Sequence, residues 1–171
     1  MPEAPLKIIL TVPEGPHKVG AVVPVRVEVR NVSARPLWAV GVLDGSEAGY
    51  RHPVYKTSIK GPRPAPPDES EGCGNVAPLR LEDFRRLAPG EGFDPTDASA
   101  GPNFLPLLAF ASFAPAHAGR YELGLTLSTE SANPEDWLGM LGYPGEEAVV
   151  ARLREVPRLR VESAAAVVEV G

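Results

Sequence analysis

Cysteine is nearly absent from this chain, because Cys73 is the only one among its 171 residues. One cysteine cannot form a disulfide within the chain, and it cannot supply a zinc site built from several thiolates. A protein without disulfides suits a reducing compartment, so we expect a cytoplasmic location. The first residues also lack the charged region and long apolar run that indicate a signal peptide.

Excess basic charge and long apolar runs are missing as well. The formal net charge is −5, whereas nucleic-acid-binding domains typically carry a basic patch and an isoelectric point above about 9. Four arginines between Arg152 and Arg160 are interspersed with glutamates, a pattern typical of a solvated face of mixed charge. No segment approaches the ~20 apolar residues of a membrane span. We therefore expect neither nucleic acid nor a membrane as a partner.

Familiar catalytic and metal-binding motifs are not found. The sequence has neither a Gly-x-Ser-x-Gly nucleophile motif nor a phosphate-binding loop. A blue-copper site needs two histidines close to a cysteine and often a methionine, but His17, His52 and His117 are far apart and none closely follows Cys73. We expect a protein that is not an enzyme and binds no metal or cofactor. A cysteine-dependent enzyme, with His52 or His117 as the base, is the enzymatic alternative.

Short strands joined by turns dominate what is present. Hydrophobic residues make up 43% of the chain, enough for a core, and 20 prolines and 17 glycines favour many turns over long helices. Alternation of apolar and polar residues predicts strands at 6–12, 23–30, 37–42, 54–59 and about 120–129, a short strand at Phe93, and a last strand at 159–170. The last strand loses its alternation near 163–166, which predicts a bulge there.

Three segments are harder to interpret. Residues 78–87 fit either a short helix or a strand, and the apolar run 103–113 fits either a buried plug or a strand that begins at Leu107. Val149, Val150 and Leu153 share one face of a predicted helix within a long insertion, 130–158.

Tyr121 carries the strongest indication of the fold. It follows a Gly119 turn and begins an alternating strand, which is typical of the tyrosine corner of immunoglobulin-like sandwiches. In that corner the tyrosine hydroxyl bonds to backbone a few residues upstream. Trp38, in the third predicted strand, is expected to be buried between the sheets.

These features together resemble the bacterial immunoglobulin-like and fibronectin-III-like β-sandwiches, and in outline the small intracellular proteinase-inhibitor sandwiches. The residues that carry the resemblance are Lys18-Val19-Gly20, Asn31-Val32-Ser33 after the valine alternation, Leu87-Ala88-Pro89-Gly90-Glu91 and Ala118-Gly119-Arg120-Tyr121-Glu122-Leu123. The resemblance implies an all-β chain, an antiparallel immunoglobulin-like sandwich with a short helical insertion before its last strand. It implies a single domain over 1–171, with elaborated segments at 61–86 and 130–158.

The resemblance transfers no function, so the candidate site comes from the loops. In such a sandwich the insertion 130–158 shares an end with the loop at 31–36. Trp137 and Tyr143 in the insertion and Arg35 in the loop are the candidate binding residues, and we expect a non-catalytic module that binds another protein. The alternatives are a carbohydrate-binding module that uses the two aromatic rings, a proteinase-inhibitor-like protein, or an insertion that only covers the end of the sandwich.

Overall fold

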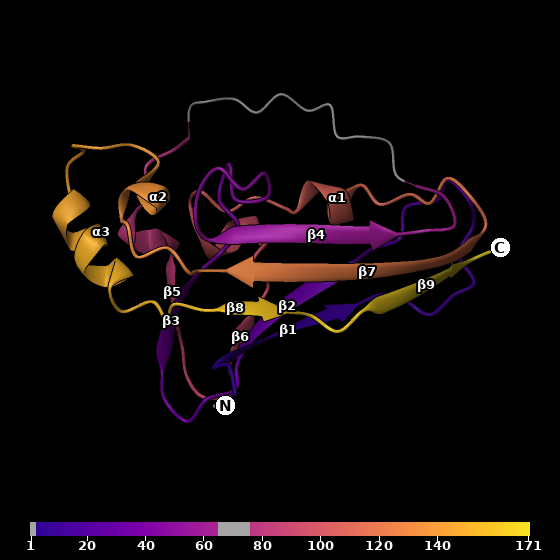
Figure 1. Ribbon diagram of the computed structural model, residues 1–171, viewed down its shortest axis with the longest axis horizontal. Helices are drawn as coiled ribbons and strands as arrows, with labels where there is room; N and C mark the ends of the chain where they lie inside the picture. Colours follow the sequence, from indigo (N-terminus) through magenta and orange to yellow (C-terminus); the bar gives the residue numbers. More distant parts are fainter. Residues whose placement is uncertain (1–2, 65–75) are drawn as a thin grey trace.

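The computed structural model describes residues 3–64 and 76–171, and this part is β-rich with few helices. Strands account for 30% and helices for 14%, and the named strands pair antiparallel. Figure 1 shows extended strands along the length of the molecule, with two of the short helices, α2 and α3, at one end and the C-terminus at the other. Of the elaborated segment 61–86, residues 65–75 lie outside the described part.

The first sheet contains the two strands predicted nearest the N-terminus. Its order is β1 (Leu6–Thr11), β2 (Arg26–Asn31) and β6 (Gly92–Phe93). Ile8 pairs with Val29 across the β1–β2 ladder, so the apolar faces of both strands coincide. Val27 and Val29 are buried, as their alternation with polar residues predicts.

The second sheet is built around its longest strand, β7. It contains β4 (Val54–Lys60), β7 (Gly119–Ser128), β8 (Arg160–Glu162) and β9 (Ala166–Val170), with β4 on one side of β7 and both β8 and β9 on the other. Between β8 and β9, residues 163–165 lie opposite only Gly124 and Leu125. This is the predicted bulge, and Ser163 bonds through its N–H to the Leu125 carbonyl at 2.8 Å.

A third ladder corrects the prediction for Trp38. Strand β3 (Leu37–Val40) pairs with β5 (Phe84–Leu87), and β4 occupies the place beside β7. Because Leu37 and Ala39 face the main core, Trp38 lies on the opposite face and is only half-buried. Tyr55 on β4 is the aromatic that is fully buried in the main core, and its hydroxyl donates to the Val40 carbonyl at 2.6 Å.

The two segments that the sequence left open are now resolved. Residues 78–87 contain both predicted forms, because a 3-10 turn, η1 (Leu81–Asp83), leads directly into β5. The run 103–113 contains a short helix, α1 (Leu108–Ala111), so the alternative of a strand from Leu107 is wrong. It fits the predicted plug on one side only, because Leu105 and Leu108 are exposed. Leu107, Phe110 and Phe113 recur at helical spacing and are all buried. A second 3-10 turn, η2 (Ala98–Ala100), precedes this plug.

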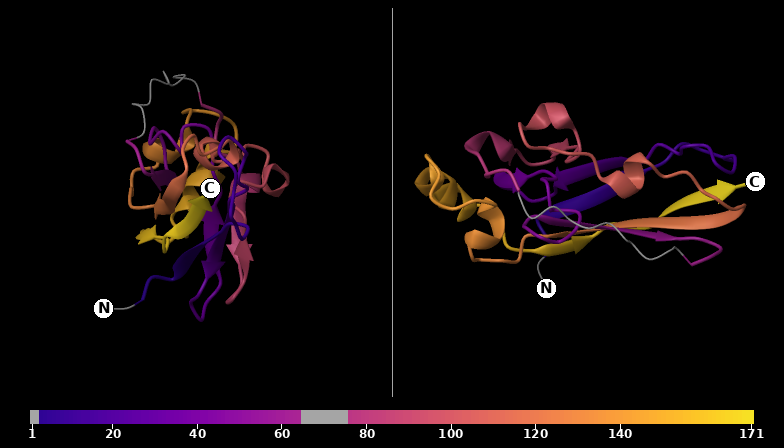
Figure 2. Two further views of the ribbon diagram at one scale, coloured as in Figure 1. Left: turned by 90° about the vertical axis from the view of Figure 1, so that its right-hand side faces the viewer. Right: turned by 90° about the horizontal axis from the view of Figure 1, so that it is seen from above.

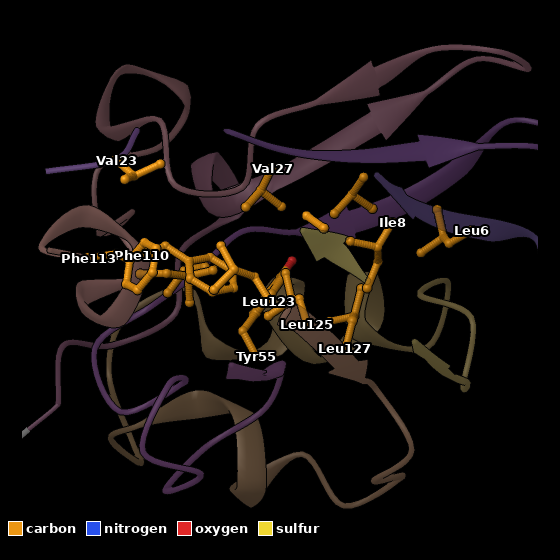
Figure 3. Close-up of a cluster of buried hydrophobic side chains, with 14 of the residues drawn as sticks. Leu6, Ile8, Val23, Val27, Tyr55, Phe110, Phe113, Leu123, Leu125 and Leu127 are labelled. Atoms are coloured by element: carbon orange, nitrogen blue, oxygen red, sulfur yellow. The ribbon is translucent and has the colours of Figure 1, made fainter. Parts of the chain in front are cut away.

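The main core lies between the first and second sheets. Figure 3 shows Leu6, Ile8 and Val27 facing the side chains of β7, with Phe110 and Phe113 beside them. The corner before β7 has the predicted tyrosine bond: the Tyr121 hydroxyl donates to the His117 carbonyl at 2.9 Å, and the side chain is buried. Gly61 makes room for this ring, because a Cβ there would lie 2.5 Å from Tyr121.

A second core joins the long insertion to the rest of the molecule. The insertion contains α2 (Glu135–Leu138) and α3 (Glu146–Leu153), and Val149 and Leu153 are buried on one face of α3 as predicted. Trp137 and Leu138 pack with them against Val40 and Phe84 of the β3–β5 ladder. The second view in Figure 2 shows α2 and α3 together at one end of the strands. The insertion thus closes that end.

Candidate functional site

A hollow of about 530 Å³ opens where the loop at 31–36 meets the end of α3. Its walls include Arg35 from the loop, Trp38 from β3, Arg86 from β5 and Arg152 from α3. The loop 31–36 and the insertion therefore lie at the same end of the strands, as predicted from the sequence, and Arg35 lies where they meet. The hollow is the strongest candidate site because it brings together three arginines from separate elements.

Asn31 determines the shape of the loop that carries Arg35. Its buried side-chain amide donates to the Arg35 carbonyl at 2.7 Å and to the Leu87 carbonyl on β5 at 3.0 Å. Its amide oxygen accepts from the Ser33 N–H at 2.9 Å and from the Ser33 hydroxyl at 2.7 Å. Three of these bonds lie within the loop and the fourth connects it to β5, so Arg35 projects from backbone that is held in place.

Trp38 lies beside two of the three arginines. Arg86 lies directly opposite Trp38 in the β3–β5 register, and directly opposed residues share a face of a sheet. The Arg152 guanidinium carbon lies 3.8 Å from the centre of the indole ring, which is a close cation–π contact. Arg152 is also held by Glu155, whose carboxylate oxygen lies 3.0 Å from Nε.

The hollow has a positive charge on an acidic chain. Its lining contains three guanidinium groups against the one carboxylate of Glu155, which leaves two positive charges in excess, while the whole chain carries −5. Arg35 and Arg86 are exposed, and neither forms a salt bridge with any residue in 3–64 or 76–171. Arg152 does not belong to a purely solvated face, which corrects the interpretation of its arginine cluster.

Trp137 does not offer an exposed ring to a ligand. Its side chain is 0% exposed, and the indole N–H donates to the Ser131 carbonyl at 3.0 Å. His52 and Arg158 lie near the ring, at 5.6 Å between ring centroids and at 5.2 Å from guanidinium carbon to centroid. The prediction that Trp137 is exposed for binding is therefore wrong. The ring fills the second core, which agrees with the alternative of an insertion that covers the end of the strands.

Tyr143 is half-buried and also serves the second core. Its hydroxyl donates to the Leu79 carbonyl at 2.7 Å, and burial raises the pKa of this phenol. The two rings that a carbohydrate-binding site would need are thus buried or partly buried, and neither lines the hollow. Of the three predicted binding residues, only Arg35 is at the candidate site.

Arg51 is a buried residue that the sequence gives no reason to single out. Its guanidinium donates to Asp44 at 3.0 Å, to the Ala77 carbonyl at 2.7 Å and to the Trp137 carbonyl at 2.5 Å. Burial lowers its pKa, and the charge of Asp44 opposes that shift. Arg51 thus joins Asp44 and Ala77 to α2 of the insertion, which is an architectural role.

Comparisons with protein-family models, with curated proteins and with solved structures found no match to this chain. Within 3–64 and 76–171, no helix is both long and apolar enough to cross a membrane. In the same ranges, His, Cys, Asp and Glu do not form a group of three or more that suits a metal ion. Cys73 lies outside the described residues, so the hypothesis of a cysteine-dependent enzyme stays an untested prediction.

Proposed function

We propose that this protein is a non-catalytic binding module that holds another protein at the end formed by the loop 31–36 and α3. The observation that carries the proposal is the convergence of Arg35, Arg86 and Arg152 around Trp38. Arginine and aromatic residues are enriched in protein interfaces, and a few such residues supply most of the binding energy.

The proposed scaffold is an immunoglobulin-like sandwich. Its support is the pair of antiparallel sheets around one core, the tyrosine corner at Tyr121 and the insertion before the closing strands. In this interpretation β4 is the third strand of the sandwich, beside β7, and the β3–β5 ladder is an addition that carries the site. Such scaffolds present binding loops at the ends of rigid sheets.

The preorganised backbone and side chains of the hollow favour binding. The bonds of Asn31 already order the loop, and the stacking of Arg152 on Trp38 already orders one guanidinium. These groups are already ordered before a partner arrives. Binding therefore costs less conformational entropy than it would if the loop and side chains had to become ordered on binding. No reacting group is needed for this role, which is why we propose binding rather than catalysis.

Site-specific photo-crosslinking tests the proposal. A benzophenone amino acid at position 34, where Ala34 is exposed beside Arg35 in the loop, is expected to crosslink a partner polypeptide in an extract of the source cells. The matched control is position 26, at the other end of β2, where Arg26 is also exposed. Equal labelling at both positions, or no crosslinked polypeptide at position 34, would contradict the proposed function.

A further inference from the structure

We infer that the hollow binds carboxylate side chains from an acidic segment of the partner protein, a conclusion that rests on the proposed function. The charge of the lining is the first reason. Arg35 and Arg86 are exposed and have no salt-bridge partner in the described ranges, and the site as a whole has two positive charges in excess. An acidic segment complements this charge, and charge complementarity speeds association and selects partners.

The orientation of Arg152 is the second reason. Glu155 approaches Nε at 3.0 Å, and no hydrogen bond connects Nη1 or Nη2 to another described residue. Arg152 lines the hollow, and no hydrogen bond to a described residue occupies the edge that carries these two nitrogens. Two parallel N–H donors match the two oxygens of a carboxylate, which is the geometry of a bidentate ion pair.

The face of Trp38 argues against ligands that bind by stacking. Arg152 covers the indole at 3.8 Å, so that face is already occupied by a guanidinium. A sugar or a nucleobase would have to displace this contact to stack there. The ring positions Arg152, and the charged nitrogens rather than the indole face remain available to the partner.

The α3 terminus favours carboxylates over phosphoryl groups. Arg152 and Glu155 lie at the C-terminal end of α3, where the last carbonyl groups carry partial negative charge. A phosphoryl group has nearly two negative charges and would be repelled by both these carbonyls and Glu155. Single carboxylates spaced along a peptide distribute their charge among the three arginines and experience less repulsion.

The volume of the hollow limits what enters it. About 530 Å³ is within the range of sites that hold small ligands, roughly 300–1,000 Å³. A few side chains of an extended segment fit this space, and a folded domain does not. The partner is thus expected to insert a short acidic stretch and to place the rest of its surface on the rim.

Fluorescence anisotropy with labelled peptides tests the inference. The probe is an oligoglutamate peptide in a glycine–serine background, and the matched glutamine and phosphoserine peptides are its comparisons. We expect the glutamate peptide to bind best, with an affinity that falls as ionic strength rises. Arg35→Gln and Arg86→Gln are each expected to weaken binding by about fivefold, while Arg26→Gln leaves it unchanged. Unaltered thermal unfolding of these exposed-site variants verifies that they fold.

The possible outcomes separate this inference from the proposed function. Equal binding of the glutamine peptide, equal effects of Arg26→Gln and Arg35→Gln, or binding of the phosphoserine peptide alone would each overturn the inference. If position 34 crosslinks a polypeptide but oligoglutamate does not bind, the acidic segment is wrong and the proposed function stands. If oligoglutamate binding depends on Arg35 but no polypeptide crosslinks, the anion site exists and the proposed function is wrong.

Discussion

Replacing Arg51 by methionine is expected to lower the free energy of unfolding by about 3 kcal/mol. Methionine keeps an unbranched apolar side chain but removes all donors, so Asp44 and the carbonyls of Ala77 and Trp137 lose their bonds to the guanidinium. Removing one partner of a buried ion pair typically costs about 3–5 kcal/mol. The lower end applies here because Asp44 is 34% exposed and also accepts from the Ala77 N–H at 2.8 Å.

Urea denaturation, followed by circular dichroism and by tryptophan fluorescence, measures this loss. A loss of about 3 kcal/mol corresponds to a fall in the melting temperature of about 10 °C for a chain of this size. The matched control is Arg85→Met, because Arg85 is only half-buried and has no salt bridge with a described residue. If Arg51→Met costs less than about 1 kcal/mol, as surface substitutions do, the argument that Arg51 clamps the insertion is wrong.

Three further predictions use the same kinds of measurement. Asn31→Ala removes three hydrogen bonds within the loop and one to Leu87 on β5, so we expect a loss of about 2–3 kcal/mol in urea unfolding; a loss no greater than that of Ser33→Ala would contradict this. Tyr121→Phe removes the bond to the His117 carbonyl but keeps the buried ring, which is expected to cost about 1 kcal/mol by thermal unfolding; no change would refute the role of the hydroxyl. Burial lowers the pKa of His52 below 6.5, with Asp136 opposing the shift, so the folded state binds fewer protons and its stability is lost as pH falls below about 6.5. Urea unfolding from pH 7 to pH 5 should show this loss, and a His52→Gln variant with the same pH dependence would refute it.

The local features of the fold could be predicted from the sequence. Val27 and Val29 alternate with polar residues, Tyr121 follows a glycine turn, and the last strand loses its phase near 163–166; each pattern depends only on neighbouring residues. The place of the third strand could not be predicted in this way. Segments 37–42 and 54–59 both read as strands, and the choice of which one lies beside β7 depends on long-range packing.

Only part of the candidate site was accessible from the sequence. Arg35 follows from its place in a loop at the end of the strands. Arg86 becomes a site residue only through the register that sets it opposite Trp38, and Arg152 only through the packing of α3 against the same indole. Trp137 was misjudged because a tryptophan in a long insertion looks exposed until the second core around it is known.

The surplus residue at 163–165 has a consequence for how this chain tolerates change. Before it the odd-numbered Val161 packs against the core, and after it the even-numbered Ala166, Val168 and Val170 do. Deleting one residue from 163–165 would leave two residues opposite Gly124 and Leu125, so the ladder would lose its bulge while Ala166 and Val168 stay opposite Leu123 and Tyr121 on the core face. A codon lost within the bulge is thus tolerated by the closing strand, whereas loss of Val167, inside β9, would place Glu169 opposite Tyr121 and bury a carboxylate.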